Sequence, residues 1–288
     1  MSYSAAILPG ERLHLQHGPI DLVIGVDGAR EAGFGAACSA FDGVLEGLVD
    51  ELERLRSSGW RDETPPCAVR GPVAKRMVRA VAAHEGFVTP MAAVAGAVAD
   101  HVLAAIRDVS GVRRAYVNNG GDIALWLNPG ERFRLAVAGP DGAGLGRVWI
   151  TAGDGIGGVA TSGRNGRSLS MGIADSVTVL AANAASADVA ATLIGNAVNL
   201  PGHAAIMRVP ALELRPDSDL GERKVVSEVG ALARSDVARA LRRGVDVAEK
   251  MRQRGLIHAA ALFLRGQNRV VGQEPGVIGI AEREQLDA

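Results

Sequence analysis

The sequence of 288 residues is poor in aromatic side chains and in net charge, and each shortage argues against nucleic-acid binding. Aromatic residues make up only 3% of the chain, which disfavours the stacking platforms that single-stranded nucleic acids require. The net charge is −1, and basic residues form only short clusters, so no overall field attracts nucleic acid. We therefore expect no nucleic-acid partner.

Cysteine is also scarce, and the two that occur form no metal or redox motif. Cys38 and Cys67 are too far apart for a CxxC pair and provide no disulfide framework. Cys38 is expected to pack within a helix, whereas Cys67, after two prolines, is a candidate exposed thiol. The six histidines are scattered without an HExxH pair, and no G-x-S-x-G occurs, which disfavours a serine hydrolase.

A long uninterrupted apolar run is missing as well. The most apolar stretch, 87–106, is interrupted by Pro90, Asp100 and His101, and we expect it to be too polar for a membrane span. Residues 1–17 have no basic segment and include Glu11 and Arg12, unlike a signal peptide. The sequence therefore predicts a soluble, cytoplasmic protein with no membrane partner.

Hydrophobic residues and glycine are abundant instead. Hydrophobic residues make up 48% of the chain, which suits a large core, and the 37 glycines suit tight backbone packing. Hydrophobic periodicity predicts helices over 36–56, 72–86, 91–107, 186–198 and 235–255. It predicts strands over 13–17, 20–26, 114–117, 123–127, 133–137, 147–152, 174–181, 204–209, 257–264 and 270–271. The strand over 174–181 alternates as if half-buried, and 153–172 and 215–224 read as loops.

The order of these elements predicts an α+β fold with an antiparallel sheet. No internal repeat or long linker interrupts the chain, so 1–288 is expected to form one domain with a frayed tail at 281–288.

Two polar residues at the start of the predicted helix 186–198 form the first candidate site. Asp188 and Thr192 are four residues apart and share one helix face, and their oxygen atoms are ligands that Mg²⁺ accepts. The alternative is structural. An aspartate in the first turn is favoured by the helix dipole, and a threonine hydroxyl can bond within the helix. Spacing alone favours the structural alternative.

Two glycine-rich segments are further candidates. Asn119, Gly120, Gly121 and Asp122 lie between two strands, where paired glycines either form a turn or let a ring or phosphate approach the backbone. Residues 157–168 offer hydroxyl groups, including Ser168, and two arginines that suit an anion, although a surface loop explains them equally well.

Five segments, in this order, carry a resemblance to a known family: 96–100 (GAVAD), 120–122 (GGD), 160–163 (ATSG), 176–179 (SVTV) and 187–192 (ADVAAT). They resemble the ApbE-like superfamily, whose best-known members are Mg²⁺-dependent FAD:protein FMN transferases. Longer stretches resemble its less characterised branch, uncharacterised protein family 0280: 86–100, 119–123, 168–175 and 187–196.

The resemblance implies an ApbE-like α+β fold and a set of functional residues. Asp188 and Thr192 would be catalytic and hold Mg²⁺, with a backbone carbonyl near Ala92 or Ala93. The expected flavin (FAD or FMN) or nucleotide ligand would contact a set of glycine-rich and polar residues: Asn119, Gly120, Gly121, Asp122, Thr161, Ser162, Gly163 and Ser168.

The chain also departs from these families. The transferases carry a His-x-x-x-Pro-x-Thr-Gly segment where residues 164–174 have neither histidine nor proline, and Ala95 stands where a lysine is expected. The branch usually has Gly-His-Ser where 166–168 read GRS and Gly-Lys-Ala-Asp where 172–175 read GIAD.

Three hypotheses therefore stay open. The first is a Mg²⁺-assisted transferase or pyrophosphate-cleaving enzyme acting on a flavin or nucleotide diphosphate. The second is a role in sulfur insertion during homocysteine formation, as the resemblance to the branch suggests, with Cys67 as the candidate thiol. The third is a non-catalytic ligand-binding or assembly protein. A small-molecule ligand and a homo-oligomer are compatible with all three, and no protein acceptor is indicated.

Overall fold

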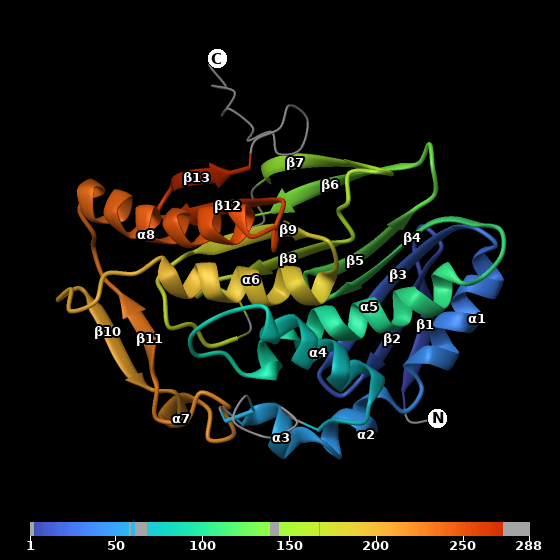
Figure 1. The fold of residues 1–288 in the computed structure, drawn as a ribbon, viewed down its shortest axis with the longest axis horizontal. Coiled ribbons are helices and arrows are strands. Elements are labelled where there is room, and N and C mark those ends of the chain that lie inside the picture. Colours follow the sequence, from blue (N-terminus) through green and yellow to red (C-terminus); the bar gives the residue numbers. More distant parts are fainter. Residues whose placement is uncertain (1–2, 58, 61–67, 139–143, 167, 273–288) are drawn as a thin grey trace.

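A computed structural model describes residues 3–57, 59–60, 68–138, 144–166 and 168–272, and the fold is built on one antiparallel sheet. Cys67 and the tail 281–288 lie outside the described residues. Nine strands form the sheet in the order β1-β2-β3-β4-β5-β8-β9-β12-β13 (Figure 1). Their bounds are β1 Ser4–Leu8, β2 Arg12–His17, β3 Ile20–Gly28, β4 Val112–Asn119, β5 Asp122–Leu127, β8 Gly158–Ser162, β9 Ser176–Ala181, β12 Ala259–Leu264 and β13 Gln267–Val271.

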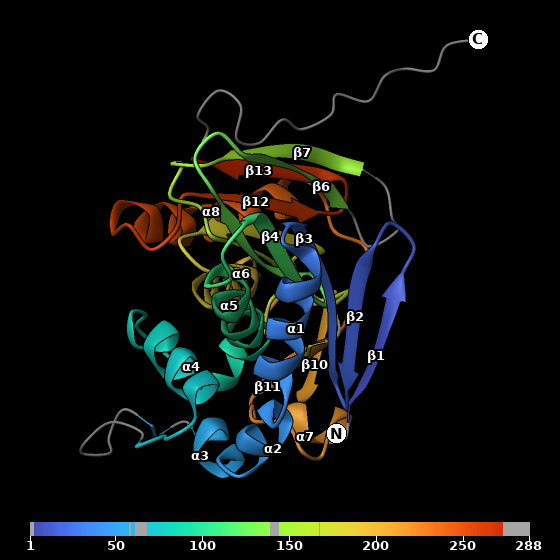
Figure 2. The same cartoon turned by 90° about the vertical axis from the view of Figure 1, so that its right-hand side faces the viewer.

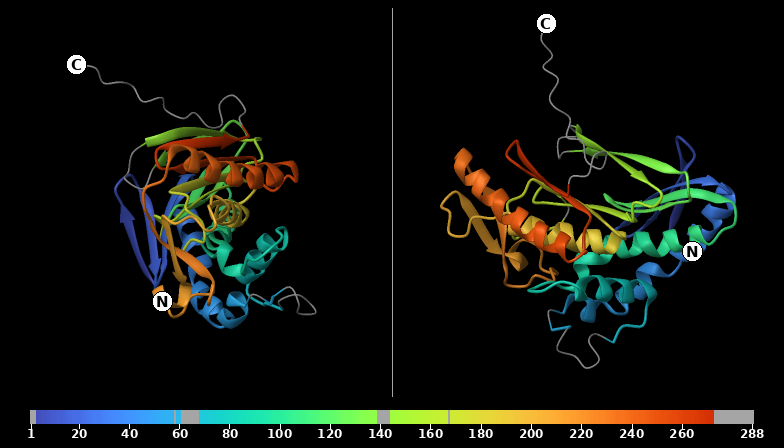
Figure 3. Two further views of the ribbon diagram at one scale, coloured as in Figure 1. Left: turned by 90° about the vertical axis from the view of Figure 1, so that its left-hand side faces the viewer. Right: turned by 45° about the horizontal axis from the view of Figure 1, so that its top comes forward.

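Helices cover one face of this sheet, and a small hairpin covers part of the other (Figures 2 and 3). The helices are α1 Arg30–Phe41, α2 Val44–Val49, α3 Leu52–Arg56, α4 Pro72–Ala82, the 3₁₀ helix η1 Pro90–Ala93, α5 Val94–Arg107, α6 Ala184–Ala197, α7 Ala211–Leu214 and α8 Arg234–Gln253. The hairpin pairs β6 Arg132–Ala138 with β7 Gly144–Thr151. The fold is therefore α+β, as predicted.

Two helical segments, Arg30–Val49 and Pro90–Arg107, are long and apolar enough to cross a membrane by length and composition alone. In the fold, the second of these packs against the sheet, and half of its most apolar window is buried. Core helices of globular domains meet the same criterion.

The predicted helix over 36–56 is wrong in extent, because three helices occupy this region. The chain turns at Gly43, whose φ of 72° lies in the left-handed region that favours glycine, and α2 begins there. Phe41, Val44 and Leu48 are nevertheless buried. The periodic apolar residues correctly identified the buried face. The interruption of the predicted helix at Gly43 depends on local backbone geometry, which the periodicity does not indicate.

The predicted loop over 153–172 contains a central strand, β8, that sequence reasoning missed. A Cβ placed on Gly158 would lie 2.1 Å from the carbonyl carbon of Asn183, so this glycine lets the start of α6 approach β8. Its neighbour β9 pairs with β8 and β12, and all of its residues are buried rather than half of them. Glycine here serves close packing, a use that a loop-like composition hides.

A second small sheet was only half predicted. β10 Ile206–Pro210 corresponds to the expected strand, but its partner β11 Lys224–Val229 begins within the predicted polar loop. The short helix α7 follows β10, and the loop after it reaches the end of α3, where Asp217 pairs with Arg56. This arrangement brings residues 215–223 next to the N-terminal helices.

The N-termini of α5 and α6 meet near the middle of the molecule, and each helix caps the other (Figure 1). Asp100 of α5 accepts hydrogen bonds from the backbone N–H groups of Ala184 (3.0 Å) and Ala185 (2.9 Å). Asp188 of α6 accepts from the N–H of Gly96 at 3.1 Å. Free N–H groups in a first turn need acceptors, and carboxylates also offset the positive helix ends. The two aspartates therefore hold α5 and α6 together.

The structural alternative for Asp188 is thus wrong in its detail. α6 begins at Ala184, and its own cap is Asn183, whose side-chain oxygen accepts from the N–H of Ser186 at 2.8 Å. Asp188 is the fifth residue of α6 and caps a different helix.

We expect Gly96→Ala to destabilise the protein. A Cβ at Gly96 would lie 2.3 Å from the carbonyl oxygen of Ala184, so α5 and α6 would have to separate. Overpacking of this kind costs about 1–3 kcal/mol. Chemical denaturation measures the loss. The control is Gly35→Ala on α1, where an added Cβ meets nothing within 4 Å and better helix propensity should be neutral or stabilising.

Burial at the helix junction raises the pKa of Asp100 from 3.8 to about 6, against the lowering effect of its two backbone hydrogen bonds and of Arg76. The folded state therefore favours the protonated form. This contribution to stability is complete below about pH 4 and is lost as the pH rises through about 6.

We expect the difference in unfolding free energy between the wild type and Asp100→Asn to fall, by up to about 3 kcal/mol, between pH 4 and pH 7. Denaturant titrations at several pH values measure it. Asp108→Asn, at the exposed end of the same helix, is the control and should follow the wild type. A difference that stays constant with pH would contradict the assignment.

Candidate functional site

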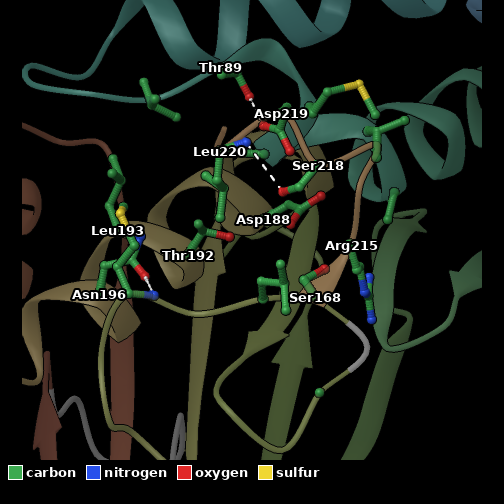
Figure 4. Close-up of a pocket in the computed structure, with 18 of the residues that line it drawn as sticks. Thr89, Ser168, Asp188, Thr192, Leu193, Asn196, Arg215, Ser218, Asp219 and Leu220 are labelled. Carbon is green, nitrogen blue, oxygen red and sulfur yellow. Dashed lines mark hydrogen bonds between the residues drawn. The ribbon is translucent and has the colours of Figure 1, made fainter. Parts of the chain in front are cut away.

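A cavity of about 520 Å³ opens beside the junction of α5 and α6 (Figure 4). It collects seven of the residues singled out from sequence, which come from five separate parts of the chain. These residues are Ala92, Gly120, Asp122, Thr161, Ser168, Asp188 and Thr192. Its volume lies within the range of small-molecule sites, roughly 300–1,000 Å³.

Asp188 is the most perturbed group in this cavity. It is mostly buried, and burial raises the pKa of its carboxyl well above the usual value. The neighbouring carboxylate of Asp122 raises that pKa further, whereas the hydrogen bonds from the N–H groups of Gly96 and Ala95 lower it. Two carboxyl groups in one half-buried place repel each other, and a proton or a cation relieves that repulsion.

Thr192 lies one turn further along α6, and its hydroxyl group is directed toward the side of the cavity that holds Asp188 (Figure 4). The backbone of Ala92 lines the same cavity, whereas Ala93 is fully buried. The helix spacing of Asp188 and Thr192 thus places both in one cavity, as predicted.

This donor set fits Mg²⁺ in its chemistry. It comprises two carboxylates, a hydroxyl and nearby backbone, and Mg²⁺ usually takes one or two carboxylates and completes its shell with water or phosphate. Among the described lining residues there is no histidine or cysteine, the ligands that zinc prefers. Nor do three or more His, Cys, Asp or Glu side chains gather anywhere in the described parts of the chain to form a closed metal cage.

The double glycine at 120–121 is both a turn and a wall of the site. Gly120 and Gly121 have φ angles of 64° and 113°, so the tight connection from β4 to β5 favours glycine at both positions. A Cβ placed on Gly121 would meet nothing within 4 Å, so the turn faces open space. The turn that the sequence offered as one alternative is therefore confirmed, and the same segment lines the cavity.

Gly121, Ser162 and Gly163 line a second cavity, of about 420 Å³, on the other face of the sheet. The two cavities meet at the end of the sheet, where Gly120 and Thr161 line both. The predicted ligand-contacting residues are thus divided between two adjoining compartments.

Asn119 and Ser168 have different surroundings. Asn119 is 4% exposed, and its side-chain amide donates to the carbonyl of Ala95 at 3.1 Å, so it ties β4 to the start of α5. Ser168 is exposed on the rim of the first cavity. Asn119 therefore supports the site from behind, and Ser168 borders it.

Sequence reasoning missed a segment that lines the first cavity close to Asp188 (Figure 4). Residues 215 and 217–220 line the cavity, and contacts tie this segment to distant parts of the chain. Thr89 donates to Asp219 at 2.5 Å (Figure 4). Arg56 pairs with Asp217 at 3.1 Å. The guanidinium carbon of Arg223 lies over the ring of Phe87, 3.4 Å from the ring centroid. These contacts join positions about 130 or more apart, and nothing in the local sequence of a polar loop indicates them.

Comparison with known proteins finds relatives that carry only a provisional family name. UPF0280 proteins are 36% identical in Methanothermobacter thermautotrophicus, over 48% of this chain and 53% of the relative. The UPF0280 protein of Methanospirillum hungatei is 35% identical over 55% of this chain and 66% of the relative. The match spans about half to two thirds of the length of these relatives.

Among solved structures, the chain is similar to the ApbE protein of Thermotoga maritima, with 12% identity and a TM-score of 0.47 over 93% of this chain and 96% of the other. It is also similar to the flavin transferase ApbE of Vibrio cholerae, with 16% identity and a TM-score of 0.48 over 93% and 97%.

The family itself is shown by a model of the family described as "AbpE bacteria", which matches residues 5–270. The segments that suggested the ApbE-like resemblance all lie within this match. The chain therefore belongs to the AbpE family of bacteria.

Proposed function

We propose that this protein binds a flavin or nucleotide diphosphate with Mg²⁺ and catalyses a transferase or pyrophosphate-cleaving reaction on it. The observation that carries the proposal is the crowding of Asp188 against Asp122 beside Thr192, in a cavity of ligand size. A divalent cation relieves this repulsion and lets a negatively charged diphosphate approach two carboxylates. The flavin or nucleotide follows from the resemblance of the motifs.

Each residue group has a separate part in the proposal. Asp188 and Thr192 would hold the metal, and Asp122 and the backbone of Ala92 line the same cavity beside them. The N–H groups of Gly96 and Ala95 fix the orientation of the Asp188 carboxylate. Bound Mg²⁺ supplies Lewis-acid chemistry by neutralising phosphate charge. The turn at 120–121 offers bare backbone to the ligand.

We expect the wild type with FAD and Mg²⁺ to retain flavin and release AMP, and Asp188→Asn to lower the Mg²⁺-dependent signal at least about tenfold. Asparagine keeps one oxygen to accept from Gly96, so α5 retains part of its cap while the charge is lost. Calorimetry measures binding, and chromatography measures AMP.

The control is Asp246→Asn on the exposed side of α8, which removes the same charge far from the cavity. Absence of both FAD binding and AMP release in the wild type would contradict the proposal. Equal flavin binding by the wild type and Asp188→Asn, without cleavage, would instead identify a non-catalytic binding protein.

A further inference from the structure

A third cavity, of about 470 Å³, borders the junction of α5 and α6 and has no part in the proposed function. It shares no lining residue with the metal cavity or with the cavity beside the hairpin. Asp100 lines it, whereas Asp188 lines the metal cavity, so the two capping aspartates border different cavities. Its volume also lies within the range of small-molecule sites, roughly 300–1,000 Å³.

Two arginines from neighbouring helices give this third cavity a positive charge. Arg76 of α4 and Arg107 of α5 line it, and Asp100 is the one carboxylate among its described lining residues. Both oxygens of Asp100 already accept hydrogen bonds from the backbone of α6. The guanidinium group of Arg76 has no carboxylate within 4.0 Å in the described parts of the chain. Arg107 pairs through its Nε with Asp108 at 3.3 Å, which leaves its two terminal nitrogens for another acceptor.

The loop 151–157 adds uncovered backbone to the same cavity. Gly153, Gly155 and Gly157 line it without side chains, and a Cβ placed on Gly153 would meet nothing within 4 Å. In the part of the chain that the structure describes, the backbone N–H groups of Gly153, Gly155 and Ile156 donate to no other group. Uncovered backbone N–H groups in turns are donors that anions use.

Two hydrogen bonds fix this loop in place. The ring Nε2 of His258 donates to the carbonyl of Gly155 at 3.1 Å, and the N–H of Gly157 donates to the carbonyl of Ala181 at 3.0 Å. The first bond ties the loop to β12, and the second ties it to the end of β9. The wall of the cavity is therefore formed before any ligand arrives, which lowers the entropic cost of binding.

Apolar side chains complete the lining. Leu103, Trp126 and Ile156 all border the cavity, and Trp126 is half-buried, with part of its ring packed on the core beneath the helices. Small-molecule sites typically combine such walls with a few polar groups that fix orientation. Here the polar groups are cationic, so the cavity suits a ligand with one anionic group and an apolar body.

We propose that the third cavity is a second ligand site, separate from the metal cavity, which binds a small organic anion through Arg76 and Arg107 and holds its apolar body against Trp126. The anionic group can be a carboxylate or a phosphate, because a guanidinium fork recognises both. The site does not rest on the proposed function.

Two aromatic anions test the site without Mg²⁺: 4-nitrobenzoate carries a carboxylate, and 4-nitrobenzylphosphonate carries a stable phosphate analogue. We expect at least one to bind the wild type in calorimetry, and the one that binds more tightly identifies the anionic group. The uncharged 4-nitrobenzyl alcohol has a similar ring and should bind at least about tenfold more weakly, because it forms no charge-assisted hydrogen bond.

The double variant Arg76→Gln/Arg107→Gln should bind the anions at least about tenfold more weakly than the wild type. Its melting temperature should stay close to that of the wild type, because neither arginine forms a buried ion pair in the described chain. Arg242→Gln is the matched control, since Arg242 is exposed on α8 and lines none of the three cavities. It should bind the anions like the wild type.

Tryptophan fluorescence shows where the probes bind. Nitroaromatic rings quench a tryptophan that they contact, and the chain has three, Trp60, Trp126 and Trp149. Of these, Trp126 lines the third cavity. Trp126→Phe should remove most of the quenching while calorimetry still detects binding, because phenylalanine keeps an apolar ring in that place.

Four results would overturn the site. They are a wild type that binds neither anion, an alcohol that binds as tightly as the anions, an arginine double variant that binds like the wild type, and quenching that persists in Trp126→Phe. If the double variant does not fold, Arg107→Gln alone takes its place, and the quenching test stands unchanged. None of these measurements uses FAD or Mg²⁺, so failure here leaves the proposed function to its own experiment.

Discussion

The mutual capping of α5 and α6 is the interaction on which the rest of the structure depends. Two helix N-termini that meet bring two positive helix ends and several free N–H groups to one place. Asp100 and Asp188, one from each helix, supply hydrogen-bond acceptors to the N-terminus of the partner helix. The carboxylate that completes this junction, Asp188, also faces the cavity, so the proposed metal ligand is held by the interaction that joins the helices.

Close approach between backbones makes this junction possible. Gly96 contacts the start of α6, and Gly158 in β8 contacts the same turn from the sheet side. Gly172 lies against the end of α6, where a Cβ would come within 2.0 Å of the carbonyl oxygen of Gly195. A chain with 37 glycines and few aromatic residues is built for such contacts, because small residues let helices lie directly on strands.

The end of the sheet near 120–121 and 163–166 separates two compartments of different character. The helix side holds Asp122 and Asp188 and is also lined by residues 215 and 217–220. The hairpin side is lined by apolar and neutral residues apart from Asp175, which pairs with Arg164. The two cavities therefore differ in charge and lie at opposite faces of the same strand ends.

Sequence by itself determined the α+β class, most helices and strands, the family, and the shared face of Asp188 and Thr192, because these depend on periodicity and local motifs. It could not distinguish a first-turn aspartate from one that caps another helix, and it mistook the close-packed β8 for a loop. Only tertiary structure decided that Asp100 and Asp188 cap each other's helices, that Asp219 reaches Thr89, and that Ser176 lines the second cavity. These are contacts between residues about 40 to 130 positions apart, and the burial that gives them their energy exists only once the chain has folded.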